Sequence, residues 1–253
     1  VLWFADLGYR YDLDDQGLIY HYSPERAKDL PDTYKYNDGM GHEVRAIYSV
    51  LAYNTTQIDK APKDWDDVTT DDYKGSLAIA NPAYSGGAMT TLSVHVEPDN
   101  ESTVGWDWYQ KLADNDVKME QSNGTLLTKV ASGEYKGAVI VDYLPRNSKN
   151  EGSPIDYVYP ESGSVLIPTP LCLMANMSDD DKAAAEAFVN YMFDIETQKL
   201  FVQQGYVPMI SEAAEGTEVP TIDDIKVLPM DVNYMRENSG SMLEKFTSIF
   251  GAQ

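Results

Sequence analysis

A short loop near residue 85 combines the residue types that bind anions. Ser85, Gly86 and Gly87 stand between an apolar run that ends at Asn81 and an apolar, helix-like run that begins at Ala88. At a strand-to-helix turn, free backbone N–H groups and the positive end of the helix dipole favour an anion, and glycines permit close approach. Taken alone, a serine before a helix is more often an N-cap in a turn. The motif therefore predicts either an anion site or a plain helix cap.

A second loop of the same kind follows about 35 residues later. Gln121, Ser122 and Asn123 supply three hydrogen-bonding side chains in succession, and Gly124 precedes a helix expected from Thr125. An Asx-type cap explains this loop equally well. The chain has no GxxxxGK[ST] motif, so nucleotide hydrolysis gains no support.

A carboxylate and a phenol end the next apolar segment. Asp142 and Tyr143 follow the strand-like run from Ala138 to Val141, and α/β folds place ligands at the carboxyl ends of such strands. A turn residue at a strand end is the alternative for Asp142.

Charge and cysteine content restrict the class of protein. The 253 residues include 41 acidic and 19 basic side chains, a net charge of -22 that would repel a nucleic-acid backbone or an anionic membrane surface. Cys172 is the single cysteine, so no intramolecular disulfide is possible. No apolar run reaches the roughly 18 residues of a membrane span, so we expect no membrane insertion of this chain.

The elements that must position these loops alternate between strands and helices. The pattern predicts an α/β architecture with parallel sheet. Val1 to Phe4 reads as a buried strand that begins at residue 1. We therefore expect that the sequence lacks a βα unit N-terminal to this strand. Expected strands are 43–54, 75–81, 117–120, 136–143 and 163–174, and expected helices are 88–96, 106–115, 125–133, 179–193, 196–204 and 240–250.

Two long expected strands, 43–54 and 163–174, bracket a block large enough to be a domain. The chain would then cross between two lobes twice. The predicted organisation is residues 1–48 in the first lobe, 49–165 in the second, and 166–253 returning to the first.

Several motifs of the chain resemble one family in that family's order. The sequence is similar to the iron-type and phosphosugar-type periplasmic binding proteins over essentially its whole length. The resemblance implies a type II periplasmic-binding fold of two α/β lobes joined by two crossing strands, which close on a ligand. The motifs are the run from Trp65 through 72–75 and 80–86, then Gln121-Ser122-Asn123-Gly124, 130–134, 157–163 and Gly205-Tyr206-Val207-Pro208.

The resemblance implies roles for individual residues. Backbone amides from Ser85 to Ala88 would hold a phosphate, together with Gln121, Ser122 and Asn123. Asp142 stands where iron-binding relatives carry the first of two tyrosines, and as in phosphosugar-binding relatives it would accept hydrogen bonds from ligand hydroxyls. Asp6 matches an acidic ligand position of the first lobe. Beside the resemblance, the aromatic side chains of Trp3, Tyr84 and Tyr143 could line a sugar-like ligand, although aromatic residues in strands are usually core. Arg45 is the candidate side-chain cation near the cleft, with a surface ion pair as the alternative. Glu161 either faces the cleft or is exposed.

The function implied is that of an extracytoplasmic solute-binding protein of an ABC importer, with no catalysis and no cofactor. We expect a small phosphorylated or other anionic solute, a sugar phosphate or an organophosphonate, in the interlobe cleft, and a membrane permease as partner. The protein would be a monomer, periplasmic or extracellular, tethered as a lipoprotein to the outer face of the cytoplasmic membrane.

Two alternatives stay open. The first is binding of ferric ion with a synergistic anion, although His21, His42 and His95 lie outside the recognisable ligand segments and no metal site is predicted. The second is a hydrolase that uses a pair of carboxylates. The sequence contains no GxSxG or HExxH motif that would support a hydrolase.

Overall fold

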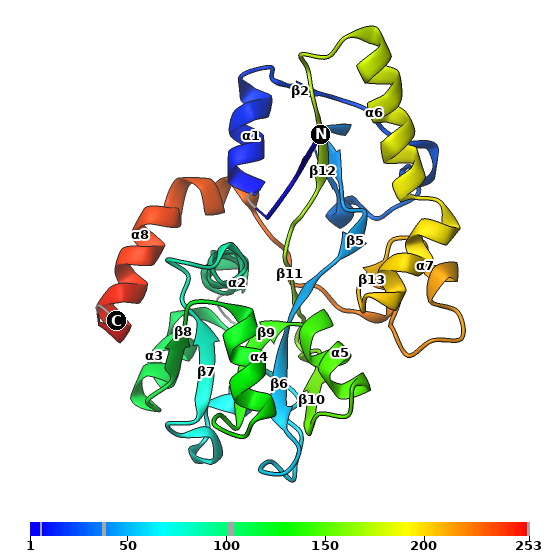
Figure 1. Cartoon of the computed structure of the whole chain (residues 1–253). Helices are drawn as coiled ribbons and strands as arrows, with labels where there is room; N and C mark the ends of the chain where they lie inside the picture. Colours follow the sequence, from blue (N-terminus) through cyan, green and yellow to red (C-terminus); the bar gives the residue numbers. More distant parts are fainter. Residues whose placement is uncertain (6, 37–38, 101–103, 252–253) are drawn as a thin grey trace. The chain divides into compact units, whose positions relative to one another are not determined.

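The chain folds into two compact units, each built from two stretches of sequence (Figure 1). The computed structural model describes residues 1–5, 7–36, 39–100 and 104–251. Unit 1 contains residues 1–47 and 168–224, and unit 2 contains residues 48–167 and 225–253. Among the described residues, no helix combines the length and the apolar character needed to span a bilayer.

Unit 1 is held by short antiparallel strands. One sheet has the order β1-β12-β4-β3, with β2 also paired to β12, and a second sheet pairs β13 with β5. The elements are β1 (Leu2–Trp3), α1 (Leu7–Asp15), β2 (Ile19–Tyr20), β3 (Lys35–Tyr36), β4 (Gly41–His42), β5 (Arg45–Ala46), β12 (Leu171–Met174), α6 (Asp179–Met192), α7 (Ile195–Gln203) and β13 (Val207–Pro208).

The first apolar residues do form a strand, but they are not buried as expected. Trp3 and Phe4 are 38% and 37% exposed, and β1 pairs with β12 in antiparallel orientation. A short apolar run does not by itself distinguish a buried strand from a half-exposed one.

Unit 2 is a mixed sheet with helices packed against it. The strand order is β10-β6-β9-β7-β8, and β11 also pairs with β6. β7 is parallel to both β8 and β9, whereas β6 is antiparallel to its partners β9, β10 and β11. The elements are β6 (Tyr48–Asn54), β7 (Leu77–Ala80), α2 (Gly86–Val96), α3 (Gly105–Asp114), β8 (Lys118–Glu120), α4 (Asn123–Ala131), β9 (Gly137–Val141), α5 (Tyr143–Asn150), β10 (Ile155–Val158), β11 (Val165–Leu166) and α8 (Val232–Phe250).

Alternate residues of three neighbouring strands form the core beneath α4. Successive side chains of a strand point to opposite faces, so every second residue lies on one face. Leu126 and Val130 of α4 are fully buried against this face. The strand residues of the cluster are Val50, Ala52, Ala78, Ala80, Ala138 and Ile140.

The two long expected strands are interrupted in the structure. The run 43–54 divides into β5 and β6 at Ile47, and the run 163–174 divides into β11 and β12 around Pro168 and Pro170. Proline has no N–H to donate to a strand ladder, which explains the second break.

The C-terminal segment differs most from the expected organisation. Residues 225–253 were expected in the first lobe, whereas they group with unit 2, so the chain passes between the units three times rather than twice. The cause is α8, which packs on α2 and α3 of that unit. The helix begins at Val232, not at Gly240, because Asp231 caps it by accepting hydrogen bonds from the amides of Asn233 and Tyr234.

A buried carboxyl group ties two distant segments of unit 1 together. Glu43 is fully buried, and its Oε1 accepts hydrogen bonds from the Thr169 amide at 2.8 Å and from the Tyr36 hydroxyl at 3.1 Å. The Thr169 hydroxyl donates to Oε2 at 3.2 Å. Burial raises the pKa of Glu43 from 4.5 to about 7, because the interior disfavours the charged form.

This raised pKa predicts a pH dependence of stability. A proton bound by folded Glu43 stabilises the protein at low pH, and that contribution is lost as the pH rises through 7. Between pH 5 and pH 8 the free energy of unfolding of the wild type should fall by about 2 to 3 kcal/mol more than that of Glu43→Gln. Urea denaturation at both pH values measures this, with the exposed Glu218→Gln as control. If the free energy of unfolding changes by the same amount between pH 5 and pH 8 in wild type and in Glu43→Gln, the prediction is wrong.

Candidate functional site

Three helices of unit 2 begin at the same edge of the sheet. The register pairs Ala80 of β7 with Glu120 of β8 and Ile79 of β7 with Val139 of β9, so the carboxyl ends of these parallel strands meet. Each strand is followed within a few residues by a helix, namely α2, α4 and α5 (Figure 1). The positive ends of three helix dipoles therefore lie along one edge.

The loop before α2 leaves two backbone donors unused. Ser85 is the N-cap, and its Oγ accepts a hydrogen bond from the Ala88 amide at 3.3 Å. In the described part of the chain, the amides of Gly86 and Gly87 have no hydrogen-bond partner. Both glycines have ordinary negative φ, so the backbone does not require glycine at either position.

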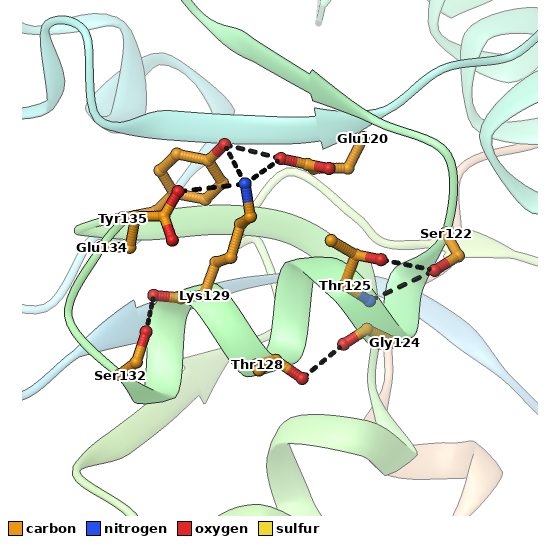
Figure 2. A network of polar contacts seen from close by, with 9 residues as sticks. All are labelled: Glu120, Ser122, Gly124, Thr125, Thr128, Lys129, Ser132, Glu134 and Tyr135. Carbon is orange, nitrogen blue, oxygen red and sulfur yellow. Dashed lines mark hydrogen bonds and ion pairs between the residues drawn. The ribbon is translucent and has the colours of Figure 1, made fainter.

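The loop before α4 repeats this arrangement. Ser122 caps the helix through a hydrogen bond of 3.2 Å from the Thr125 amide, which Figure 2 shows. The amides of Asn123 and Gly124 have no partner among the described residues. Two adjacent helix starts thus present four free backbone N–H groups. Gln121 is exposed beside them.

Asn123 also links this loop to the next strand. Its Oδ1 accepts a hydrogen bond from the Val141 amide at 3.2 Å, which orients the side-chain amide at the end of β9. Gly87, Ala88 and Asn123 line one pocket of unit 2. The structure therefore brings together the two loops that the sequence singled out. Other residues of this pocket include Ser49, Pro82, Thr91, Trp108, Val141, Ile167 and Phe246.

Asp142 lies in the interior, behind the edge of the sheet. Its side chain is fully buried, and Oδ1 accepts a hydrogen bond from the Tyr48 amide at 3.0 Å. Oδ2 accepts from the Arg146 guanidinium at 3.0 Å and from the Tyr159 hydroxyl at 2.8 Å. The carboxylate therefore already accepts three hydrogen bonds from within the protein. Tyr143, the first residue of α5, is partly buried next to it.

The remaining candidates of unit 2 lie outside the pocket. The Tyr84 side chain is 65% exposed. Glu161 is also exposed and lies 3.9 Å from the Lys63 ammonium group. Neither lines the pocket that joins the two loops.

Two candidates of unit 1 contact each other. The guanidinium carbon of Arg45 lies 5.0 Å from the centre of the Trp3 ring and 4.1 Å from that of Tyr206. Tyr206 was not predicted as a site residue, although it precedes the strand β13 that pairs with β5. Asp6 lies outside the described residues.

Metal ligands do not gather in the described part of the chain. Among residues 1–5, 7–36, 39–100 and 104–251, no group of three His, Cys, Asp or Glu side chains could hold a metal ion. His95 is fully buried, and burial lowers its pKa to about 3. The groups that sequence reasoning missed are Arg146 and Tyr159, the partners of Asp142, because neither lies in a recognisable motif.

Removal of the Asp142 carboxylate should mainly destabilise the fold. Asp142→Ala would leave Arg146, which is 3% exposed, without its counter-ion, and such a loss costs about 3 to 5 kcal/mol. Urea denaturation measures the loss, with the exposed Glu161→Ala as control, for which we expect a change within about 0.5 kcal/mol. Equal stability of the two variants would show that Asp142 is not needed for packing.

The chain is similar to several known binding proteins. A probable ABC transporter periplasmic-binding protein of Sinorhizobium fredii, y4fP, is 26% identical over 246 residues, which are 92% of this chain and about two thirds (67%) of that protein. The periplasmic binding protein AfuA of Actinobacillus pleuropneumoniae, solved with fructose-6-phosphate bound, has a TM-score of 0.79 at 19% identity. The match covers 99% of this chain and 82% of the AfuA chain. Iron-bound HitA of Pseudomonas aeruginosa has a TM-score of 0.77 at 18% identity, over 97% of this chain and 81% of its own.

These solved structures share the two-lobed α/β fold of periplasmic binding proteins, which this chain therefore adopts. The family model of bacterial extracellular solute-binding proteins matches residues 4–238. The match covers most of the chain, and the protein belongs to the family of bacterial extracellular solute-binding proteins.

Proposed function

We propose that this protein is the solute-binding component of an ABC importer and that it binds a small phosphorylated or other anionic solute, such as a sugar phosphate or an organophosphonate. The observation that carries the proposal is a set of four amides at two neighbouring helix starts, those of Gly86, Gly87, Asn123 and Gly124, which have no hydrogen-bond partner among the residues that the structure describes. Helix N-termini of this kind bind phosphate and other anions through N–H groups and the helix dipole. The partner would be a membrane permease, with the protein held outside the cytoplasmic membrane.

Backbone N–H donors suit an anion, whereas a bare cation would need acceptor atoms as ligands. The cations nearest in sequence to the sheet edge already have partners, since Arg146 binds Asp142 and Lys129 binds Glu120. The ligand would therefore be recognised by neutral donors and by the Asn123 side chain. Apolar residues of the same pocket, such as Pro82 and Ile167, would contact the part of the solute that carries no charge.

The relatives support an importer without fixing the solute. The S. fredii protein is named as a probable ABC transporter component, and AfuA was solved with a sugar phosphate. HitA is iron-bound, so ferric ion with a synergistic anion is the competing ligand.

A thermal-shift panel tests the class of ligand. A solute present at a hundred times its dissociation constant stabilises the folded state by about 2.7 kcal/mol. For a chain of this size we therefore expect the unfolding midpoint to rise by about 5 to 10 °C with the correct phosphorylated solute. The panel should contain inorganic phosphate, hexose phosphates, an alkylphosphonate, neutral hexoses, and ferric ion with and without phosphate. A shift with ferric ion alone, or release of free phosphate from a hexose phosphate, would replace our proposal by metal binding or by hydrolysis.

Gly86→Pro tests the role of the backbone donors. Gly86 is the first residue of α2, where proline is tolerated, and Ser85 before it already has the extended conformation that proline requires (φ -118°, ψ 112°). The variant removes one N–H group from the site while leaving the helix intact. Loss of one charge-assisted hydrogen bond should weaken binding about ten- to hundredfold by titration calorimetry.

Gly86→Ala is the matched control, because it keeps the N–H group and also favours the helix. It should bind within about threefold of wild type. If Gly86→Pro and Gly86→Ala bind equally well, the amide of Gly86 does not contact the ligand.

A further inference from the structure

A partly exposed network of ion pairs joins the end of β8 to the last turn of α4. Lys129, in the last turn of α4, places its Nζ 2.8 Å from Oε1 of Glu120, 3.0 Å from Oε1 of Glu134 and 3.2 Å from the Tyr135 hydroxyl. The Tyr135 hydroxyl in turn donates to Glu120 Oε1 at 2.6 Å. Figure 2 shows that the side chains of Glu120, Glu134 and Tyr135 converge on the Lys129 ammonium group.

Glu120 is the residue at which the two loops meet. It is the last residue of β8, and its carbonyl oxygen accepts a hydrogen bond of 2.8 Å from the Asn81 amide, where the loop to α2 begins. The chain itself continues from Glu120 through Gln121 to Ser122, the N-cap of α4. A shift of Glu120 would therefore move both helix starts.

The carboxylate of Glu120 also matters through its charge. Two residues of extended chain, a span of about 7 Å, connect the backbone of Glu120 to Ser122, and the Glu120 carboxylate is directed toward Lys129 and Tyr135 (Figure 2). The hydrogen bonds from Lys129 and Tyr135 lower the pKa of Glu120, so this carboxyl group is ionised at neutral pH. An ionised carboxylate at the end of β8 adds negative charge to the region of the two loops unless a cation compensates it.

We propose that Lys129 is a positioning residue for the anion site: it fixes Glu120, which connects the two anion-binding loops, and it neutralises the charge of that carboxylate. The inference rests on the proposed function. Lys129 itself is not placed in the pocket, so it would act through Glu120 and not by contact with the solute.

The test combines single and double substitutions with calorimetry. Lys129→Met should weaken the binding of hexose phosphate and of inorganic phosphate about tenfold, because Glu120 keeps its charge and its hydrogen bond from Tyr135 but loses its counter-ion. Glu120→Gln in the Lys129→Met background removes that charge and should restore most of the affinity. Lys129→Arg keeps the positive charge and should bind within about threefold of wild type.

Lys118→Met is the control for loss of one positive charge. Lys118 is exposed and lies on the same strand as Glu120, so its removal should leave affinity within about twofold of wild type. Thermal midpoints of all variants separate misfolding from weaker binding. Should Lys129→Met fail to fold, Tyr135→Phe removes one of the hydrogen bonds to Glu120 and should weaken binding by a smaller factor in the same direction.

Two outcomes would overturn the inference about Lys129 while leaving the proposed function intact. Either Lys129→Met binds as tightly as Lys118→Met, or the double variant binds no better than Lys129→Met. Failure of the wild type to bind any anion of the panel would overturn the proposed function as well, and the two failures are thereby distinguished.

Discussion

The parallel pairing of β7 with β8 and β9 is the constraint on which the candidate site depends. Parallel strands end on the same side, so the loops that follow them must meet, and each helix must begin where its strand has ended. An antiparallel partner at any of these positions would have moved one helix start to the opposite edge. The pocket between Gly87 and Asn123 follows from this topology and not from either loop alone.

Nearby basic residues compensate the carboxylates of Glu120 and Asp142 at one edge of the sheet. The chain carries a net charge of -22, yet the two acidic residues at the ends of β8 and β9 are each paired with a basic residue of the following helix. Glu120 pairs with Lys129 and Asp142 with Arg146. The donors offered to a ligand at the starts of α2 and α4 include backbone amides without a partner among the described residues, whose dipoles attract an anion without the desolvation cost of a buried cation.

The sequence predicted the loops better than it predicted the side chains around them. Ser85 and Ser122 precede helices in a local pattern, and local hydrogen bonds are sufficient to form a cap, so both starts could be foreseen. The burial of Asp142 depends on Tyr159, 17 residues away, and on the backbone of Tyr48, 94 residues away. Contacts of that kind leave no periodicity in the sequence. The early start of α8 was hidden by Gly240, a poor helix former that the packing on α2 and α3 tolerates.

The four free amides at the starts of α2 and α4 share one chemical property: none of them titrates. A recognition surface made of such groups keeps the same charge state at every physiological acidity, and it offers hydrogens but no lone pairs. An incoming phosphate ester, in contrast, changes from monoanion to dianion at a pKa of about 6. Any change of affinity with pH would thus come from protonation of the ligand and not from these amides. The dianion would be preferred, because the monoanion carries a hydrogen that would point at an N–H donor.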